Sequence, residues 1–213
     1  MRACTILLNG ELYTTERLKK QIESTYVVAV DGGMKHAKQL SLTPQLWLGD
    51  FDSCDEALKE RYKDIPQQCF PHNKDKTDGA LAIEHAVNLG ASKLILCGAF
   101  GGERFDHALL HVMQAVSLAA KGYEVLLTTG RQEGVPILAG EAYVFKYKAE
   151  TLFSIIALDD LKGLEIKGAK WNLENTDIDR GLSRTLSNRM GSDGTLELFL
   201  RSGNAILVTY MPS

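Results

Sequence analysis

Along the first 130 residues, short apolar runs alternate with segments in which apolar residues recur every three or four positions. Val27–Val30 and Leu94–Leu96 are apolar at every position, which is typical of strands buried on both faces of a parallel sheet. The pattern predicts strands at Cys4–Leu8, Tyr26–Val30, Leu46–Leu48, Lys93–Cys97 and Glu124–Thr128. It predicts helices at Thr15–Ser24, Gly33–Leu40, Asp55–Tyr62, Thr77–Leu89 and Phe105–Lys121. This alternation favours an α/β domain with a doubly wound, mostly parallel sheet.

After about Gly130 the helical periodicity fades and short β-rich segments take over. Strands are expected at Gly140–Tyr147, Thr151–Leu158, Leu161–Ile166, Gly194–Leu200 and Asn204–Tyr210. These segments favour a C-terminal antiparallel β-sandwich or small barrel. Gly, Pro and charged residues gather in Gly130–Ala139, which we interpret as the boundary. The prediction is an α/β domain over residues 1–132 and a β-sandwich over residues 138–213.

Composition narrows the class of protein. The chain has 213 residues, of which 45% are hydrophobic and 24% charged, as in an ordinary globular protein. Its net charge of −3 lacks the basic surplus expected of a general nucleic-acid binder. No run approaches the roughly eighteen apolar residues of a membrane helix, and we expect no targeting segment. The four cysteines are scattered without a Cys-x-x-Cys pair, which suits a reducing cytoplasm and argues against structural zinc.

The strongest chemical signal is a pair of short acidic segments. Asp50 and Asp52 follow an apolar strand, and in an extended chain both side chains leave the same side of the backbone. Asp75 and Asp78 stand three apart at the start of a helix, where that spacing places residues on one face. Clustered carboxylates repel one another unless a cation lies among them, and Mg²⁺ prefers oxygen ligands. We therefore expect these four acids to bind Mg²⁺.

Each acidic segment also has a simpler interpretation. The first could be a solvated loop with a helix cap at Ser53 or Asp55, and the acids of the second could merely complement a helix dipole. The dipole does not explain why Lys74 and Lys76 are interleaved with the second pair of acids. Alternating acid and base at a helix start suits ammonium groups on phosphate oxygens and carboxylates on a metal ion.

A glycine-rich loop, Gly98–His107, joins an expected strand to the long helix after it. Gly101 and Gly102 allow close backbone approach, and the free N–H groups of the helix start can hold an anion. Arg104 adds a planar guanidinium suited to phosphate. A tight turn explains the glycines equally well, and the loop matches neither the P-loop nor the dinucleotide-binding fingerprint.

In their order along the chain, these segments resemble one family, thiamine pyrophosphokinase. The motifs are Asp31-Gly32-Gly33, Gly49-Asp50-Phe51-Asp52-Ser53, Asp75-Lys76-Thr77-Asp78, Gly101–His107, Lys170-Trp171-Asn172-Leu173 and Ser187-Asn188. Each motif alone is weak, but the ordered set over nearly the whole chain is specific. The resemblance implies transfer of the pyrophosphoryl group of ATP to the hydroxyl of thiamine, giving thiamine diphosphate and AMP. It also implies a homodimer with sites between subunits.

The resemblance further implies roles for individual residues. Beside the four acids, which would be catalytic and bind magnesium, the ATP side comprises Asp31, Gly32, Lys76, Thr77, Gly101, Gly102, Arg104, Asp106 and His107. Asp78 is one candidate for the carboxylate that orients or deprotonates the hydroxyl. In the second domain Trp171 would stack on a thiamine ring, although a tryptophan on a strand is more often part of a core. Ser187 and Asn188 would hydrogen-bond the aminopyrimidine.

One departure and two alternatives accompany this interpretation. Arg189 stands where the family pattern Ser-Asn-Glu has an acid, so a carboxylate near the cationic thiazolium is lost. Asp-x-Asp after a strand also occurs in haloacid-dehalogenase phosphatases, but there it usually follows the first strand, whereas two strand–helix units precede it here. A non-catalytic thiamine or nucleotide sensor would keep the pockets and lose the acids, all of which are present.

Overall fold

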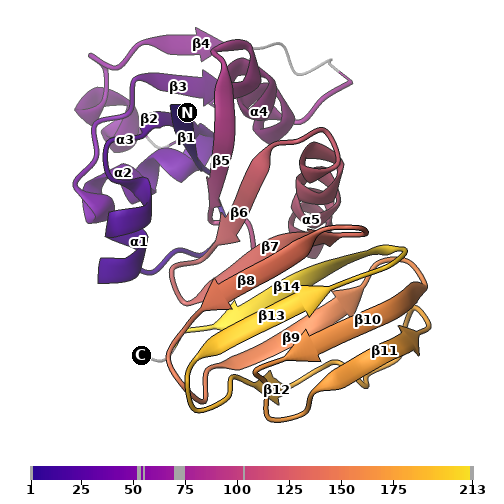
Figure 1. The fold of residues 1–213 in the computed structure, drawn as a ribbon. Helices are drawn as coiled ribbons and strands as arrows, with labels where there is room; N and C mark the ends of the chain where they lie inside the picture. The colour runs from indigo at the N-terminus through magenta and orange to yellow at the C-terminus, as the bar shows by residue number, and fades with distance from the viewer. Residues whose placement is uncertain (1, 52–53, 55, 70–74, 103, 212–213) are drawn as a thin grey trace. The chain divides into compact units, whose positions relative to one another are not determined.

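The computed structural model describes residues 2–51, 54, 56–69, 75–102 and 104–211, and the chain forms two compact units (Figure 1). The N-terminal unit comprises Met1–His111 and Gly122–Gly130, and the C-terminal unit comprises Val112–Lys121 and Arg131–Ser213. Asp52 is one of the expected magnesium ligands, and it lies outside the described residues. The domain division at residues 132–138 stays a prediction.

Parallel strands form the sheet of the N-terminal unit, in the order β6-β5-β1-β2-β3-β4. Their bounds are β1 (Arg2–Leu7), β2 (Tyr26–Val30), β3 (Leu46–Gly49), β4 (Gln67–Cys69), β5 (Ala91–Cys97) and β6 (Glu124–Thr128). The central strands are apolar on both faces and carry fully buried side chains such as Ile6, Val28 and Leu94. The predicted parallel α/β sheet is confirmed. The edge strand β4 was missed because its three residues are exposed and two are glutamines.

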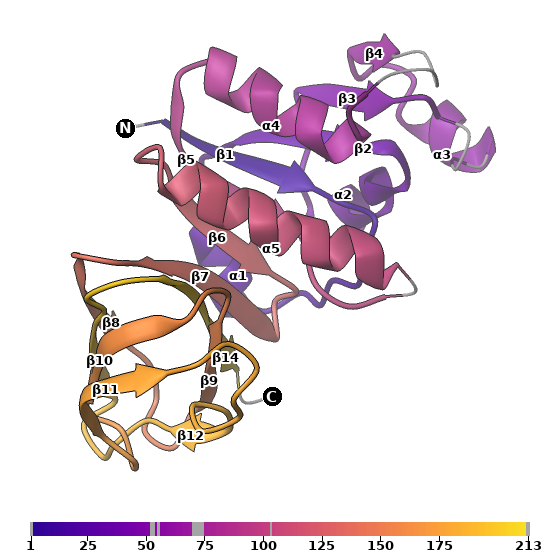
Figure 2. The same cartoon turned by 90° about the vertical axis from the view of Figure 1, so that its right-hand side faces the viewer.

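Helices cover both faces of this sheet: in Figures 1 and 2, α1 and α2 lie on one face and α4 on the other. The bounds are α1 (Glu16–Ile22), the 3-10 helix η1 (Asp31–Met34), α2 (Lys35–Leu40), α3 (Glu56–Arg61), α4 (Asp78–Asn88) and α5 (Phe105–Ala119). Thr77 is the N-cap of α4, because its Oγ1 accepts a hydrogen bond from Ala80 N at 3.3 Å. The buried residues Gly79, Ala82 and Ala86 are small, so α4 can pack closely. Within the described part of the chain, no helix is long and apolar enough to cross a membrane.

Two antiparallel sheets face each other in the C-terminal unit (Figure 2). One sheet has the order β12-β9-β14-β7 and the other β11-β10-β13-β8. The bounds are β7 (Gln132–Leu138), β8 (Ala142–Lys146), β9 (Leu152–Ala157), β10 (Leu161–Lys167), β11 (Leu173–Ile178), β12 (Asn188–Arg189), β13 (Thr195–Phe199) and β14 (Asn204–Tyr210). The core between the sheets contains Phe153 and Leu207 from one sheet and Ile166 and Leu198 from the other. The predicted β-sandwich is confirmed.

The segment interpreted as the domain boundary, Gly130–Ala139, contains strand β7. This strand pairs with β14 along its whole length, from Gln132 opposite Tyr210 to Leu138 opposite Asn204. The strand was not predicted from the sequence because its polar residues and Pro136 are more typical of a turn. A proline fits within a strand wherever its missing N–H is not needed by the ladder.

Candidate active site

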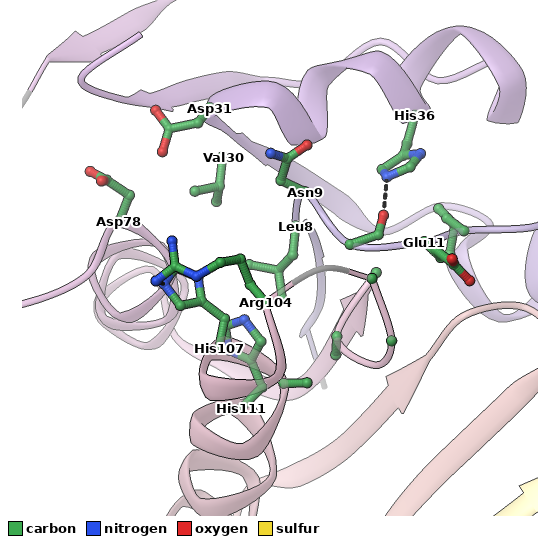
Figure 3. Close-up of a pocket in the computed structure, with 18 of the residues that line it drawn as sticks. Leu8, Asn9, Glu11, Val30, Asp31, His36, Asp78, Arg104, His107 and His111 are labelled. Carbon is green, nitrogen blue, oxygen red and sulfur yellow. Dashed lines mark hydrogen bonds between the residues drawn. The ribbon is translucent and has the colours of Figure 1, made fainter. Parts of the chain in front are cut away.

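The carboxyl ends of β1, β2 and β5 border a cavity of about 930 Å³ in the N-terminal unit (Figure 3). β1 lies where the strand order reverses, with β2 on one side and β5 on the other. Ligands of doubly wound sheets bind outside the strand ends at such a switch point. The volume is in the range of pockets that enclose a small ligand or cofactor.

Glycines bring the loops around this cavity close together. A Cβ at Gly10 would lie 2.2 Å from the carbonyl oxygen of Gly98, and a Cβ at Gly33 would lie 2.2 Å from the carbonyl oxygen of Leu7. These obstacles are backbone atoms, which cannot rotate away as a side chain can. Both positions therefore require glycine, and part of the pocket wall at Gly10 and Gly98 is main chain that a ligand can approach.

Asp31 organises the acidic edge of the pocket. It follows β2 directly and has a φ of 44°, a left-handed conformation that residues other than glycine seldom adopt. Its Oδ1 accepts hydrogen bonds from Asp50 N at 3.1 Å and Phe51 N at 3.4 Å. Its carbonyl oxygen accepts a hydrogen bond from Trp47 Nε1 at 3.0 Å. Asp31 thus fixes the chain segment that carries Asp50.

The electrostatics at this edge reflect crowded carboxylates. Burial, followed by the charge of Asp78, raises the pKa of Asp31 to about 6, and Asp50 adds to the effect. The N–H groups of Phe51 and Asp50 oppose it by stabilising the ionised form. Figure 3 shows the Asp31 and Asp78 carboxylates on the same side of the pocket. A cation bound between them would relieve this repulsion.

The donor chemistry at the acidic edge fits Mg²⁺. This ion is usually held by one or two carboxylates together with water and substrate phosphates, rather than by a complete protein cage. Asp31 and Asp78 line the pocket and offer such oxygens. Across the described ranges, no three His, Cys, Asp or Glu side chains form a metal-binding group. Asp75 is exposed and does not line the pocket.

Positive charge lines another part of the pocket. Arg104 donates from Nε to Asp106 Oδ1 at 2.9 Å and from Nη2 to Oδ2 at 2.7 Å, and Nη2 also donates to His107 Nε2 at 2.9 Å. This bidentate pairing holds the pKa of Asp106 well below its usual range. Lys35 Nζ donates to the carbonyl oxygen of Asn9 at 3.0 Å and to its Oδ1 at 2.7 Å. Asp106 therefore orients a cation of the pocket wall without lining the pocket itself.

His36 supports the glycine loop as a neutral imidazole. Burial lowers the pKa of His36 to about 4. Since the ring is neutral, the hydrogen bond at 2.9 Å to Gly10 O makes Nε2 the donor, and Nδ1 accepts from Gln39 Nε2 at 3.2 Å. His36 therefore positions Gly10 and is not poised to exchange protons near neutral pH.

The pocket gathers many of the residues that the sequence singled out, but not all. It is lined by Asp31, Thr77, Asp78, Gly101, Gly102, Arg104 and His107. Lys76 instead donates to Glu84 Oε2 at 2.7 Å, with both side chains about half exposed. Gly32 lies against the Asn9 side chain, where a Cβ would come within 2.8 Å of Oδ1.

Several pocket residues were missed in the sequence: Asn9, Gly10, Glu11, Lys35 and His111. A usable signal existed for the first three, because they follow the first strand as Asp31 follows the second. Their position at a strand end was as informative as that of the acids. Lys35 and His111 lie inside helical patterns, which say nothing about a ligand.

Trp171 lies in a turn between β10 and β11 and not on a strand, and its side chain is 55% exposed. The alternative of a core tryptophan is therefore wrong. Lys170 Nζ lies 4.8 Å from the centroid of the indole ring, in a cation–π contact. Asn188 is buried and hydrogen-bonds the backbone of Trp171, while Ser187 precedes it with a φ of 58°.

Both units match family models. Residues 18–127 match "Thiamin pyrophosphokinase, catalytic domain", and residues 143–203 match "Thiamin pyrophosphokinase, vitamin B1 binding domain". No curated protein sequence matches the chain.

Solved structures share the fold. The thiamine pyrophosphokinase of Bacillus subtilis is 22% identical over all of both chains, with a TM-score of 0.85. The enzyme of Geobacillus thermodenitrificans is 24% identical over 100% of this chain and 99% of its own, with a TM-score of 0.77. The Candida albicans protein is 14% identical over 99% and 89%, with a TM-score of 0.83.

Proposed function

The chain belongs to the thiamin pyrophosphokinase family, and we propose that its N-terminal pocket binds ATP with Mg²⁺ while the Trp171 surface binds thiamine. The enzyme transfers the pyrophosphoryl group of ATP to the hydroxyl of thiamine, giving thiamine diphosphate and AMP. One observation carries the assignment of the pocket. Carboxylates and a guanidinium line the same cavity at the switch point of a parallel sheet, as a polyphosphate and its cation require.

In this reaction the hydroxyl oxygen of thiamine forms a bond to the β-phosphorus. The bond from that phosphorus to the oxygen it shares with the α-phosphorus breaks, and AMP leaves with that oxygen. The hydroxyl proton passes to a carboxylate, for which Asp78 is our candidate because it lines the pocket at the first turn of α4. Phosphoryl chemistry depends mainly on positioning and charge neutralisation, and little on covalent help from the protein.

The chain supplies both kinds of partner for a polyphosphate. Asp31 and Asp78, which line the pocket, would hold Mg²⁺ together with Asp50, whose N–H donates a hydrogen bond to Asp31. Asp52 and Asp75 stay predicted ligands. When bound, the ion neutralises phosphate charge. Arg104 would contact phosphate oxygens with the guanidinium that Asp106 orients. Gly101 and Gly102, which line the cavity, allow the main chain to approach the same phosphates closely.

We also propose a cytoplasmic homodimer with sites between subunits. Phe105 and Leu109, one turn apart on α5, have side chains 75% and 47% exposed, an apolar surface that a second copy would cover. Among the described residues, Cys4, Cys54, Cys69 and Cys97 form no disulfide, which suits a reducing compartment. Sedimentation of the purified protein would test the dimer, since a monomer at micromolar concentration contradicts it.

The activity is tested with purified protein, ATP, thiamine and Mg²⁺. We expect AMP and thiamine diphosphate to accumulate in equal amounts, as resolved by liquid chromatography. Formation of ADP would contradict pyrophosphoryl transfer. Phosphate release without thiamine would favour the Asp-x-Asp phosphatase, and ligand binding without turnover would favour the sensor.

Replacing Trp171 with alanine is expected to raise the KM for thiamine about tenfold, because stacking of a base on an aromatic ring contributes about 1–3 kcal/mol. The KM for ATP should stay within about twofold, since no stacking partner of adenine is removed. Steady-state kinetics in both substrates measure the two values. Val144→Ala is the control, because Val144 is a similarly exposed apolar residue on β8 of the same unit. An equal rise in both KM values would argue against stacking of thiamine on Trp171.

A further inference from the structure

We propose that Asn188 is a positioning residue that holds the Trp171 turn, and that it does not bind the aminopyrimidine directly. The resemblance to the family had suggested such a direct contact. The inference deepens the proposed thiamine site and rests on it for the identity of the ligand. The holding role itself rests on the hydrogen bonds around Asn188.

The amide of Asn188 is already engaged with the backbone. Asn188 is buried, with only 6% of its surface exposed. Oδ1 accepts hydrogen bonds from Trp171 N at 3.2 Å and Arg189 N at 2.8 Å, and Nδ2 donates to Trp171 O at 2.7 Å. Two N–H donors at one atom and a carbonyl at the other fix which end of the amide is oxygen. Both acceptor sites and one of the two donor hydrogens are therefore used.

The backbone beside Asn188 supports the same turn. Lys170 N donates to Arg189 O at 2.8 Å, and Gly191 N donates to Gly168 O at 2.7 Å. Ala169 and Met190 form an isolated antiparallel bridge. Residues 168–171, which end at Trp171, are thus bound to residues 188–191 by several backbone contacts.

Residues 188–191 are anchored in turn to the opposite sheet. In β12, Asn188 pairs with Phe153 and Arg189 with Leu152 of β9. The backbone of Asn188 therefore belongs to one sheet, while its side chain holds a turn of the other. The indole is more than half exposed, but the backbone that carries it is held by contacts to both sheets. The side chain is therefore preorganised for stacking.

Arg189, the residue that departs from the family pattern, also helps to hold residues 188–191 in place. Its Nη1 donates to the carbonyl oxygen of Glu150 at 3.0 Å, a hydrogen bond that a glutamate could not donate. Glu150 N in turn donates to Met190 O at 3.3 Å. The side chain at position 189 is thus directed at the backbone of a neighbouring turn.

The test uses the fluorescence of the two tryptophans in the full-length protein. Trp47 is fully buried and Trp171 is 55% exposed, so acrylamide quenching reports mainly on Trp171. Asn188→Ala should raise the quenching constant and lower the anisotropy, because the turn loses its two hydrogen bonds with the Asn188 amide. It should also raise the KM for thiamine about tenfold, as expected for buried polar groups left unpaired, and leave the KM for ATP unchanged.

Two further variants distinguish positioning of the Trp171 turn by Asn188 from a general destabilisation of the C-terminal unit. Asn188→Asp keeps the shape of the side chain and its acceptor oxygen, but it places a second oxygen opposite Trp171 O. Like Asn188→Ala, it should therefore raise both the quenching constant and the KM for thiamine. Thr185→Val removes a buried hydrogen bond of 2.6 Å to Ile155 O in the same unit, without a contact to Trp171. It should lower the melting temperature and leave the quenching constant as in the parent.

Three outcomes would overturn the inference. A raised thiamine KM with unchanged quenching in both Asn188 variants would make Asn188 a direct ligand contact. Equal quenching changes in Thr185→Val would make the effect a general loosening, and unchanged quenching and KM would remove the role altogether. The fluorescence comparison needs no ligand. A parent protein that fails to turn over thiamine would therefore contradict the proposed function and leave the holding role of Asn188 standing.

Discussion

Replacing Gly49 with alanine is expected to lower kcat strongly, because the added methyl group would occupy the position of the Asp31 carboxylate. A Cβ at Gly49 would lie 1.7 Å from Asp31 Oδ1 and 2.5 Å from its Cγ. Asp31 must then withdraw from the N–H groups of Asp50 and Phe51, and the acidic edge of the pocket is rearranged. We expect kcat to fall about 100-fold or more, the size of effect that a shift of about 1 Å in a reacting group produces.

The measurement is AMP formation at saturating substrates, together with the dependence of the rate on Mg²⁺ concentration. Thiamine quenching of Trp171 should survive, because the C-terminal unit is untouched. Gly90→Ala is the matched control: its φ is also positive, at 79°, but a Cβ there meets nothing within 4 Å. The control should lose about 1 kcal/mol of stability and keep its activity. A Gly49→Ala enzyme with parental kcat would show that the Asp31–Asp50 contact is dispensable.

Replacing Asp78 with asparagine is expected to lower kcat about 1000-fold, within the range attributed to a lost general base. Asparagine has the same shape but cannot take the hydroxyl proton and is a weaker ligand for Mg²⁺. The start of α4 should persist, because Thr77 remains to cap it. Glu84→Gln is the control, since it removes one negative charge from the same helix on an exposed side chain. A loss of kcat below about tenfold in Asp78→Asn would exclude Asp78 as the base.

The same substitution should also change the titration of Asp31. Its pKa of about 6 lies above the ordinary value of 3.8, so the folded protein binds more protons than the unfolded chain between these values. The free energy of unfolding of the metal-free protein should therefore fall as pH rises through this interval. Because the charge of Asp78 is the second cause, Asp78→Asn should lower the pKa of Asp31 and weaken this pH dependence. Carbon-detected NMR of the Asp31 carboxyl measures the pKa, and an unchanged value would contradict the coupling.

The sequence by itself determined most of the elements and their order, although the strands β4, β7, β11 and β12 were missed. Tyr26–Val30 and Glu124–Thr128 form strands with the predicted bounds, because a strand buried on both faces is apolar at consecutive positions. The residues after the strands were also readable, since a parallel sheet collects its strand ends at one edge. Asp31 and the Gly98–His107 loop were found in this way.

Only the tertiary structure decided which of these side chains face the pocket. Lys76 and Asp78 are two residues apart in one motif, yet one pairs with Glu84 and the other lines the cavity. Likewise, Ser187-Asn188 was readable as a motif, but the Asn188 amide bonds the backbone of Trp171, seventeen residues away in the chain. Helix capping and the burial of one face of a helix or strand involve residues close together in the chain, so they leave a recognisable pattern in the sequence. Side-chain direction across strands is set by the strand order and register, which no local pattern encodes.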